Sequence, residues 1–402
     1  MNKTIDWTPS VPEGRWATLG PYYAMFPTDF VREAVARFSR PGDGVLDPFC
    51  GRGTVPFVAA STGRFAVGVD VNPVAWVFAS AKTSPEPDVQ KLVRRIHEIA
   101  ALVAPEDRHP ENEFQAWAWD AGMLGFLRAA RRELRWRADR TDWTLAAIIL
   151  VHLHGKAGTA VSNQMRQSKA MSPDYSVRWW KAREMRPPEI DPVTYFEARV
   201  AWRYTKGLPR MREWSEIELG DARDRLVSWK GSAFRLLLTS PPYCGVTNYR
   251  LDNWIRLWLL GDSPLPNGST AQKYADREGY RRLLMEAFST ARNAMSPHSV
   301  ILVRTDSRVF TRDATAATLR CLWPSHRMLA RSEKPVRSQT QLFGDKSEKP
   351  GETDILMLPP LDRRRPQGYR SVPDAAMTSV QPWLEAFPDR QPAANRSVRS
   401  VS

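Results

Sequence analysis

The segment from Gly44 to Asp70 constrains the fold of this 402-residue chain more than any other part of the sequence. Gly44 to Leu46 and Phe65 to Val69 are short apolar runs, and Val55 to Ser61 between them has helical character. A strand, a helix and a second strand within about 30 residues are typical of the β-α-β unit of a doubly wound sheet. We therefore predict an α/β fold with a parallel sheet whose strands are buried on both faces.

Three further apolar runs extend the predicted sheet. Phe234 to Leu238 and Ser299 to Val303 have strand composition, and the second follows a helical stretch from Tyr280 to Ala294. Ile355 to Leu358 is a candidate late strand. Ligands of such sheets bind beyond the carboxyl ends of the strands. The residues that follow Leu46, Val69 and Leu238 are therefore expected to meet in one cleft.

The turn after the first strand, residues 47–54, suits a nucleoside ligand. Gly51 and Gly53 let the backbone turn sharply and approach a ligand closely, although any tight strand–helix turn can use two glycines. Asp70, at the end of the next strand, can accept hydrogen bonds from both hydroxyls of a ribose. The glycine spacing differs from the dinucleotide fingerprint and offers no pyrophosphate cradle. An adenosine ligand without phosphates is favoured.

Residues 240–243 follow the third strand and suit chemistry on an exocyclic amino group. The lone pair of such a nitrogen is delocalised into the ring, so catalysis must hold both amino hydrogens. Ser240 can accept one through its side chain and Pro241 the other through its carbonyl. Pro241 and Pro242 stiffen the turn, and Tyr243 offers a face for stacking on an extruded base. Neither a metal nor a covalent adduct is needed; the alternative is a proline-stiffened turn without chemistry.

Taken together, these segments resemble the amino-methyltransferase superfamily of DNA modification enzymes. The resemblance implies a Rossmann-like sheet and S-adenosyl-L-methionine as cofactor, with Asp47 and Gly51 near its methionine part and Asp70 on the ribose. Asp221 would lie near the adenine, or would instead cap a helix. The complete cofactor site implied by the resemblance is Phe26, Pro27, Asp47, Pro48, Phe49, Gly51, Gly53, Thr54, Asp70, Val71, Asn72, Asp221 and Ala222.

The first residue of the catalytic segment indicates which base is methylated. Within the superfamily, members with Asp or Asn there usually act on adenine N6, and members with Ser or Thr usually act on cytosine N4. Ser240 therefore predicts a site-specific cytosine-N4 DNA methyltransferase with Ser240, Pro241, Pro242 and Tyr243 as catalytic residues. Adenine N6, guanine N2 of RNA, and a non-catalytic nucleic-acid-binding protein are the alternatives. Neither Cys50 nor Cys244 has the context expected for C5 methylation.

The net charge of +14 points to a polyanionic partner, here double-stranded DNA, unless it only reflects a proteome rich in arginine. Residues 151–212 concentrate this charge, with twelve Lys or Arg against five acids. We predict that this stretch recognises the target, although a solvated helical face or a lid over the cofactor is the alternative. The candidate DNA contacts are Asn163, Gln164, Arg166, Lys169, Arg178 and Arg183, with Asn248 and Tyr249 at the base pocket.

The predicted organisation has three parts. Residues 1–85 and 213–360 form the catalytic domain, 86–212 a helical and basic insertion, and 361–402 a disordered tail. Three cysteines give no disulfide framework and no zinc pattern. We expect a cytoplasmic, DNA-associated protein with no membrane segment. The resemblance also allows a cognate restriction endonuclease as a partner, and the oligomeric state stays open.

Overall fold

Eight strands form one sheet in the computed structural model, which describes residues 7–21, 26–229, 233–245, 248–263, 276–333 and 351–372. The strand order is β3-β2-β1-β4-β5-β7-β6-β8; the first five strands run parallel, and the last three pair antiparallel. The bounds are β1 Gly44–Asp47, β2 Phe65–Asp70, β3 Ser215–Leu219, β4 Phe234–Thr239, β5 Met295–Asp306, β6 Arg327–Glu333, β7 Glu352–Leu358 and β8 Arg370–Ser371. The doubly wound α/β prediction is confirmed.

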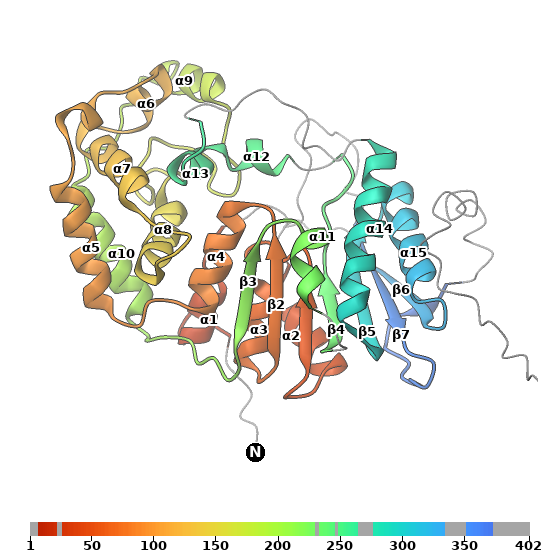
Figure 1. Cartoon of the computed structure of the whole chain (residues 1–402). Coiled ribbons are helices and arrows are strands. Elements are labelled where there is room, and N and C mark those ends of the chain that lie inside the picture. The colour runs from red at the N-terminus through yellow and green to blue at the C-terminus, as the bar shows by residue number, and fades with distance from the viewer. Residues whose placement is uncertain are drawn as a thin grey trace, which may run out of the picture.

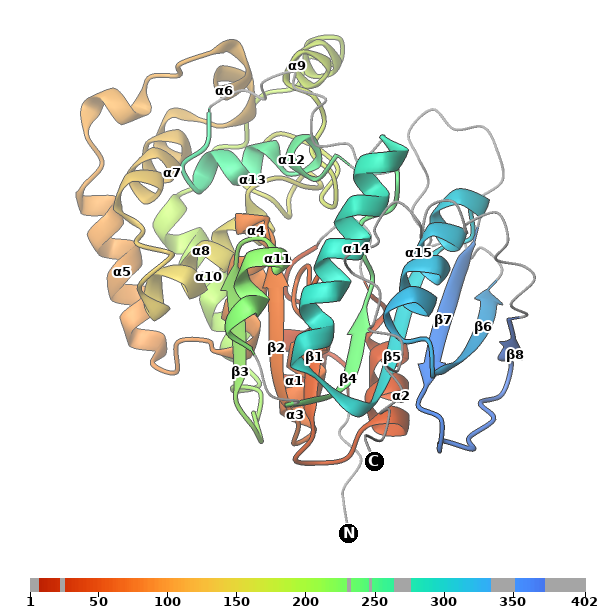
Figure 2. The ribbon, with the colours of Figure 1, turned by 45° about the vertical axis from the view of Figure 1, so that its right-hand side comes forward.

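Helices cover both faces of the sheet (Figures 1 and 2). In β1, Leu46 packs toward α11, α14 and α15, and its neighbour Val45 packs toward α2 and α3. Successive side chains of a strand point to opposite faces, so one short apolar run serves two cores. The helices of these layers are α2 Thr28–Phe38, α3 Thr54–Ser61, α11 Ala222–Arg225, α14 Arg277–Ala294 and α15 Val309–Leu322, with a 3₁₀ turn η2 at Leu226–Ser228.

A third hydrophobic cluster joins the remaining helices, most of which lie beside the β3 edge in Figure 1. They are α1 Pro12–Ala17, α4 Pro73–Thr83, α5 Val89–Ala101, α6 Glu113–Ala118, α7 Ala121–Glu133, α8 Arg140–His152, α9 Pro173–Lys181, α10 Pro192–Tyr204, α12 Tyr249–Asp252 and α13 Trp254–Leu259, with a 3₁₀ turn η1 at Pro105–Arg108. Trp254 and Trp258 of α13 are buried in this cluster. Because α4 belongs to this cluster and also packs on β2 and β3, the helical part is continuous with the sheet.

Some elements differ from the expectations. β3, β6 and β8 were not foreseen as strands, and β8 places Arg370 and Ser371 of the supposedly disordered tail against β6. Residues 361–369 and 372 of that tail are also described, and residues 373–402 lie outside the described residues. β3 carries Glu216 and Glu218, so it lacks the apolar run of an interior strand. No helix in the described ranges has the length and apolar character of a membrane span.

Candidate active site

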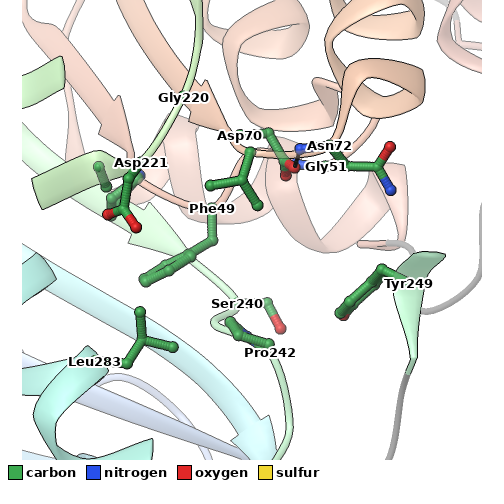
Figure 3. Close-up of a pocket in the computed structure, with 13 residues that line it drawn as sticks. Phe49, Gly51, Asp70, Asn72, Gly220, Asp221, Ser240, Pro242, Tyr249 and Leu283 are labelled. Carbon is green, nitrogen blue, oxygen red and sulfur yellow. Dashed lines mark hydrogen bonds between the residues drawn. The ribbon is translucent and has the colours of Figure 1, made fainter. Parts of the chain in front are cut away.

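A pocket opens where β1, β2, β3 and β4 end, and Figure 3 shows the side chains around it. The three segments predicted to converge all reach it, because the carboxyl ends of neighbouring parallel strands lie at one edge of the sheet. The lining residues are Pro48, Phe49, Gly51, Asp70, Val71, Asn72, Gly220, Asp221, Ala222, Ser240, Pro242, Tyr249 and Leu283. Sequence reasoning assigned no role to Leu283, which is one apolar residue among many on α14.

The two glycines of the turn between β1 and α3 do different things. Gly51 lines the pocket with φ at 50°, and a Cβ built on it would meet no other protein atom within 4 Å. Glycine therefore leaves room there for a ligand. Gly53 has φ at 75°, and its Cβ would lie 2.6 Å from the Cβ of Ala79 in α4. Gly53 and the buried Thr54 thus serve packing in this structure, and neither lines the pocket.

Asp70 fixes the turn and faces the pocket. Its Oδ2 accepts a hydrogen bond of 2.8 Å from the backbone N–H of Gly51, and its Oδ1 accepts one of 2.8 Å from that of Asn72. Burial raises the pKa of Asp70 to about 6. The Asn72 side chain caps α4 by accepting from the N–H of Val74. Val71 beside them is 58% exposed and offers an apolar surface to a ligand.

Asp47 lies below the pocket rather than in it. It is 1% exposed, and its Oδ1 accepts hydrogen bonds from the hydroxyl of Thr239 at 2.6 Å and from the N–H of Phe49 at 3.2 Å. Burial raises the pKa of Asp47 to about 7, against the opposing effect of these hydrogen bonds. The carboxyl group links the ends of β1 and β4. Direct contact with the methionine part of a cofactor stays a prediction.

Asp221 caps a helix and also lines the pocket, while its contact with an adenine stays a prediction. It lines the pocket together with Ala222, and it caps α11 by accepting from the N–H of Arg223 at 2.9 Å. The guanidinium of Arg223 pairs with Asp221 at 2.7 Å and with Glu286 of α14 at 2.8 Å. Burial works to raise the pKa of Asp221, but hydrogen bonds from Arg223 hold it below its ordinary value. The carboxyl group is therefore ionised at neutral pH.

The segment before α2 does not reach this pocket within the described residues. Phe26 stacks on Phe30 with ring centroids 5.4 Å apart, and Pro27 is exposed at the N-terminus of α2. Neither lines the pocket. Residues 22–25, which precede them, lie outside the described residues. Contact of Phe26 and Pro27 with a cofactor stays a prediction.

The catalytic segment enters the pocket through Ser240 and Pro242, while Pro241 is buried behind them. Tyr243 does not line the pocket, which corrects the expectation that its ring faces an extruded base in this conformation. Instead its hydroxyl lies 3.4 Å from Ser240 Oγ and 3.4 Å from Glu352 Oε1. Figure 3 shows a different ring, that of Tyr249, reaching in from α12 on the side away from Asp221.

Sequence reasoning gave no role to Glu352. Glu352 begins β7, and its Oε2 accepts from Nη1 of Arg304 on β5 at 3.1 Å. Arg304 is 3% exposed and forms a bidentate pair with Asp354 at 2.7 and 3.0 Å. A lone Glu before a strand carries no distinctive signal. Only the pairing of β5 with β7 brings it to the catalytic segment.

The predicted recognition residues divide into buried and exposed groups. Asn163 is 3% exposed, and its amide bonds to the carbonyl of Trp117 and to the N–H of Gln164, so the expectation that it reads DNA is corrected. Lys169 pairs with Asp252 at 2.8 Å. Asn248 is 5% exposed and caps α12. The exposed members of the predicted set are Gln164, Arg166, Arg178 and Arg183.

Residues 4–76 match a family described as DNA methylase. The Type II methyltransferase M.Cfr9I of Citrobacter freundii is 44% identical over 54 residues, and M.SmaI of Serratia marcescens is 43% identical over 53 residues. Each match covers 13% of this chain and 18% of the relative, so the likeness extends to less than a fifth of these curated proteins.

Solved structures of methyltransferases are similar to this chain only with low sequence identity and low TM-scores. The rRNA methyltransferase aviRa of Streptomyces viridochromogenes is 15% identical with a TM-score of 0.32, covering 89% of this chain and 94% of that one. A type I restriction-modification methyltransferase subunit of Streptococcus thermophilus is 9% identical with a TM-score of 0.33, covering 95% and 56%. Scores this low carry no argument about function.

The pocket fits S-adenosylmethionine, the cofactor of this family. The free lone pairs of the Asp70 carboxylate suit ribose hydroxyls, and the missing side chain of Gly51 leaves space beside them. Val71 and Phe49 offer apolar surface for an adenine, and Asp221 an acceptor for its amino group. The lining residues include no Lys or Arg, which agrees with a ligand that has no phosphate.

Proposed function

Because residues 4–76 match a family described as DNA methylase, we propose that the chain is a DNA methyltransferase acting on N4 of cytosine. The observation that supports this most is that Ser240 and Pro242 line the same pocket as Gly51 and Asp70. A cofactor held by Asp70 would thus lie beside the segment suited to hold an amino group. Such proximity and orientation are the main source of rate in a reaction that needs no enzyme nucleophile.

The residues of the segment hold the amino group for attack. Ser240 accepts one amino hydrogen through Oγ, and the carbonyl of Pro241 accepts the other. This releases the nitrogen lone pair from the ring and aims it across the pocket. When bound, S-adenosylmethionine supplies an electrophilic methyl group, whose bond to sulfur is replaced by a bond to N4 while N4 releases one proton.

An extruded cytosine is the proposed occupant of the pocket beside Ser240, since the exocyclic amino group cannot be reached inside the duplex. The ring of Tyr249, on the side of the pocket away from Asp221, is placed to stack on it. The Nδ2 atom of Asn248 is buried without an acceptor in the described ranges, and we propose that it donates to a ring acceptor of the base. The choice of cytosine rests on Ser240.

Double-stranded DNA is the proposed partner. Arg183 lies exposed just after α9, with its guanidinium 4.4 Å from the ring centroid of Trp179. In Figures 1 and 2, α9 lies beyond the edge at which β2 and β4 end, on the same side of the sheet as the pocket. Duplex DNA contacting α9 could therefore deliver a base to the pocket. A cognate restriction endonuclease stays a prediction from the resemblance.

The test is to express the chain in cells without DNA methylation, digest their DNA to nucleosides and identify the methylated base by mass spectrometry. We expect N4-methylcytosine from the wild-type protein and none from Ser240→Ala. Calorimetry should find that Ser240→Ala binds the cofactor as the wild type does, because Asp70 and Gly51 are untouched. N6-methyladenine without N4-methylcytosine would refute the choice of base, and unmethylated DNA would refute the activity.

A further inference from the structure

The hydroxyl of Ser240 can point a proton at the substrate, which the carboxylate of an aspartate in its place could not do. A carboxylate only accepts hydrogen bonds, whereas a serine hydroxyl both donates and accepts. If the Ser240 proton pointed into the pocket, it would meet an amino hydrogen instead of accepting it. A serine in this position therefore needs a partner that takes its proton.

The structure contains such a partner in a chain of three groups. Ser240 Oγ donates to the hydroxyl of Tyr243 at 3.4 Å, and that hydroxyl donates to Glu352 Oε1 at 3.4 Å. Both distances are long for O–H···O bonds, as catalytic hydrogen bonds often are before substrate binds. Tyr243 keeps its proton, because burial and the charge of Glu352 raise the pKa of Tyr243 well above its ordinary value.

Glu352 is in turn held as an acceptor. Its other oxygen accepts from Nη1 of Arg304 at 3.1 Å, and the remaining nitrogens of that guanidinium are fixed by Asp354. Arg304 also pairs with Glu333 at 3.2 Å. A carboxylate fixed in this way cannot donate. It forces Tyr243 to donate outward, and Tyr243 can then only accept from Ser240.

We propose that Glu352 is a positioning residue that sets the direction of this hydrogen-bond chain, so that Ser240 presents only lone pairs to the amino group of the substrate base. This inference rests on the proposed amino-methyltransferase function and deepens it. Glu352 does not touch the substrate and acts through Tyr243. Its ionised form is the working form. Burial raises the pKa of Glu352 above its ordinary value, and the nearby charges of Asp354 and Glu333 add to this, whereas Arg304 and the hydrogen bond from Tyr243 oppose it.

Glu352→Gln is the sharpest test, because it preserves shape and reverses polarity. Arg304 selects the amide oxygen, which turns the amide NH₂ toward Tyr243 and the Tyr243 proton toward Ser240. The Ser240 proton then points at the substrate. We expect kcat to fall roughly 10- to 100-fold, which is less than the roughly 100- to 1,000-fold loss of a group that contacts the transition state directly. The KM for S-adenosylmethionine and its calorimetric affinity should not change.

Glu333→Gln is the matched control. It removes the Glu333 carboxylate charge that pairs with the same Arg304 guanidinium, and it does not reach Tyr243. Because the Glu333 side chain is 42% exposed, kcat should stay within about twofold of wild type. In a Tyr243→Phe background the hydrogen-bond chain is already interrupted, and Glu352→Gln should then cause no further loss of kcat. The wild-type kcat should fall as acid protonates Glu352, and this limb of the pH profile should disappear in Glu352→Gln.

The outcomes separate this inference from the proposed function. A wild-type protein that transfers no methyl group to DNA overturns the function itself. If the wild type is active, the inference is overturned by any of three results: full activity of Glu352→Gln, an equal loss in Glu333→Gln, or an undiminished effect of Glu352→Gln in the Tyr243→Phe background. Lost cofactor binding in Glu352→Gln would also overturn it, since it would show a merely structural role.

Discussion

At the scale of single residues, Asp47 was expected to contact the cofactor, but its carboxyl group is held by contacts within the fold. Its oxygen accepts from Thr239, 192 positions away, and almost none of the residue is exposed. Burial of a carboxyl group disfavours its charged form. Asp47 therefore connects the ends of β1 and β4, and its contribution to the free energy of unfolding depends on pH.

We expect Asp47→Asn to remove part of the pH dependence of stability. Because burial raises the pKa of Asp47 from 3.8 to about 7, the folded state keeps a proton that the unfolded state releases between these values. The wild-type free energy of unfolding should thus fall as pH rises from about 4 to 7 relative to that of Asp47→Asn, by roughly 4 kcal/mol in total. Urea unfolding of both proteins at pH 4.5 and 7.5 measures this difference, and a gap that is the same at both pH values would contradict it.

At the scale of elements, the turn from β1 to α3 must leave space for a ligand on one side and pack closely against helix α4 on the other. Gly51 faces open space, whereas Gly53 faces Ala79 of α4. Both have positive φ, so an alanine at either position carries backbone strain. What differs is what a new methyl group would meet, which is space open to a ligand at Gly51 and the side chain of Ala79 at Gly53.

Gly53→Ala should lower stability, and Gly51→Ala should chiefly weaken cofactor binding. At Gly53 the new Cβ would lie 2.6 Å from Ala79, so overpacking adds to strain and the expected loss is roughly 2–4 kcal/mol. At Gly51 the expected loss is roughly 1 kcal/mol from strain, with at least a tenfold weaker affinity for S-adenosylmethionine because the methyl group fills its space. Thermal unfolding and calorimetry on both variants separate the two effects, and a reversed ranking would refute the assignment.

At the scale of the whole molecule, the charge of +14 is the feature most relevant to DNA. Phosphate neutralisation by Lys and Arg releases counterions and makes binding depend steeply on salt. Exposed cations on α9 and just after it lie on the side of the sheet where the pocket opens, whereas Arg37 of α2 pairs with Glu33 on the same helix. Positively charged side chains are thus exposed on the side of the sheet from which the proposed DNA substrate must reach the pocket.

We expect Arg183→Ala to weaken DNA binding about equally for all sequences and to reduce the slope of log K against log salt by about 1, as for the loss of one phosphate contact. Arg37→Ala serves as the control and should leave both quantities unchanged. Fluorescence anisotropy over a salt series, with specific and unrelated duplexes, gives these slopes. An unchanged slope for Arg183→Ala would place the DNA elsewhere.

The sequence by itself determined the parallel sheet, the glycine turn, Asp70 and the catalytic segment, because each depends on local pattern and on the rule that strand ends share one edge. Only the tertiary structure decided which side chains meet there. Tyr243 contacts Glu352 across 109 residues, and Asn163 faces inward, since register and packing set these directions. β3 escaped prediction because an edge strand with alternating glutamates needs no apolar run. Strand pairing, which local composition does not encode, completed the site.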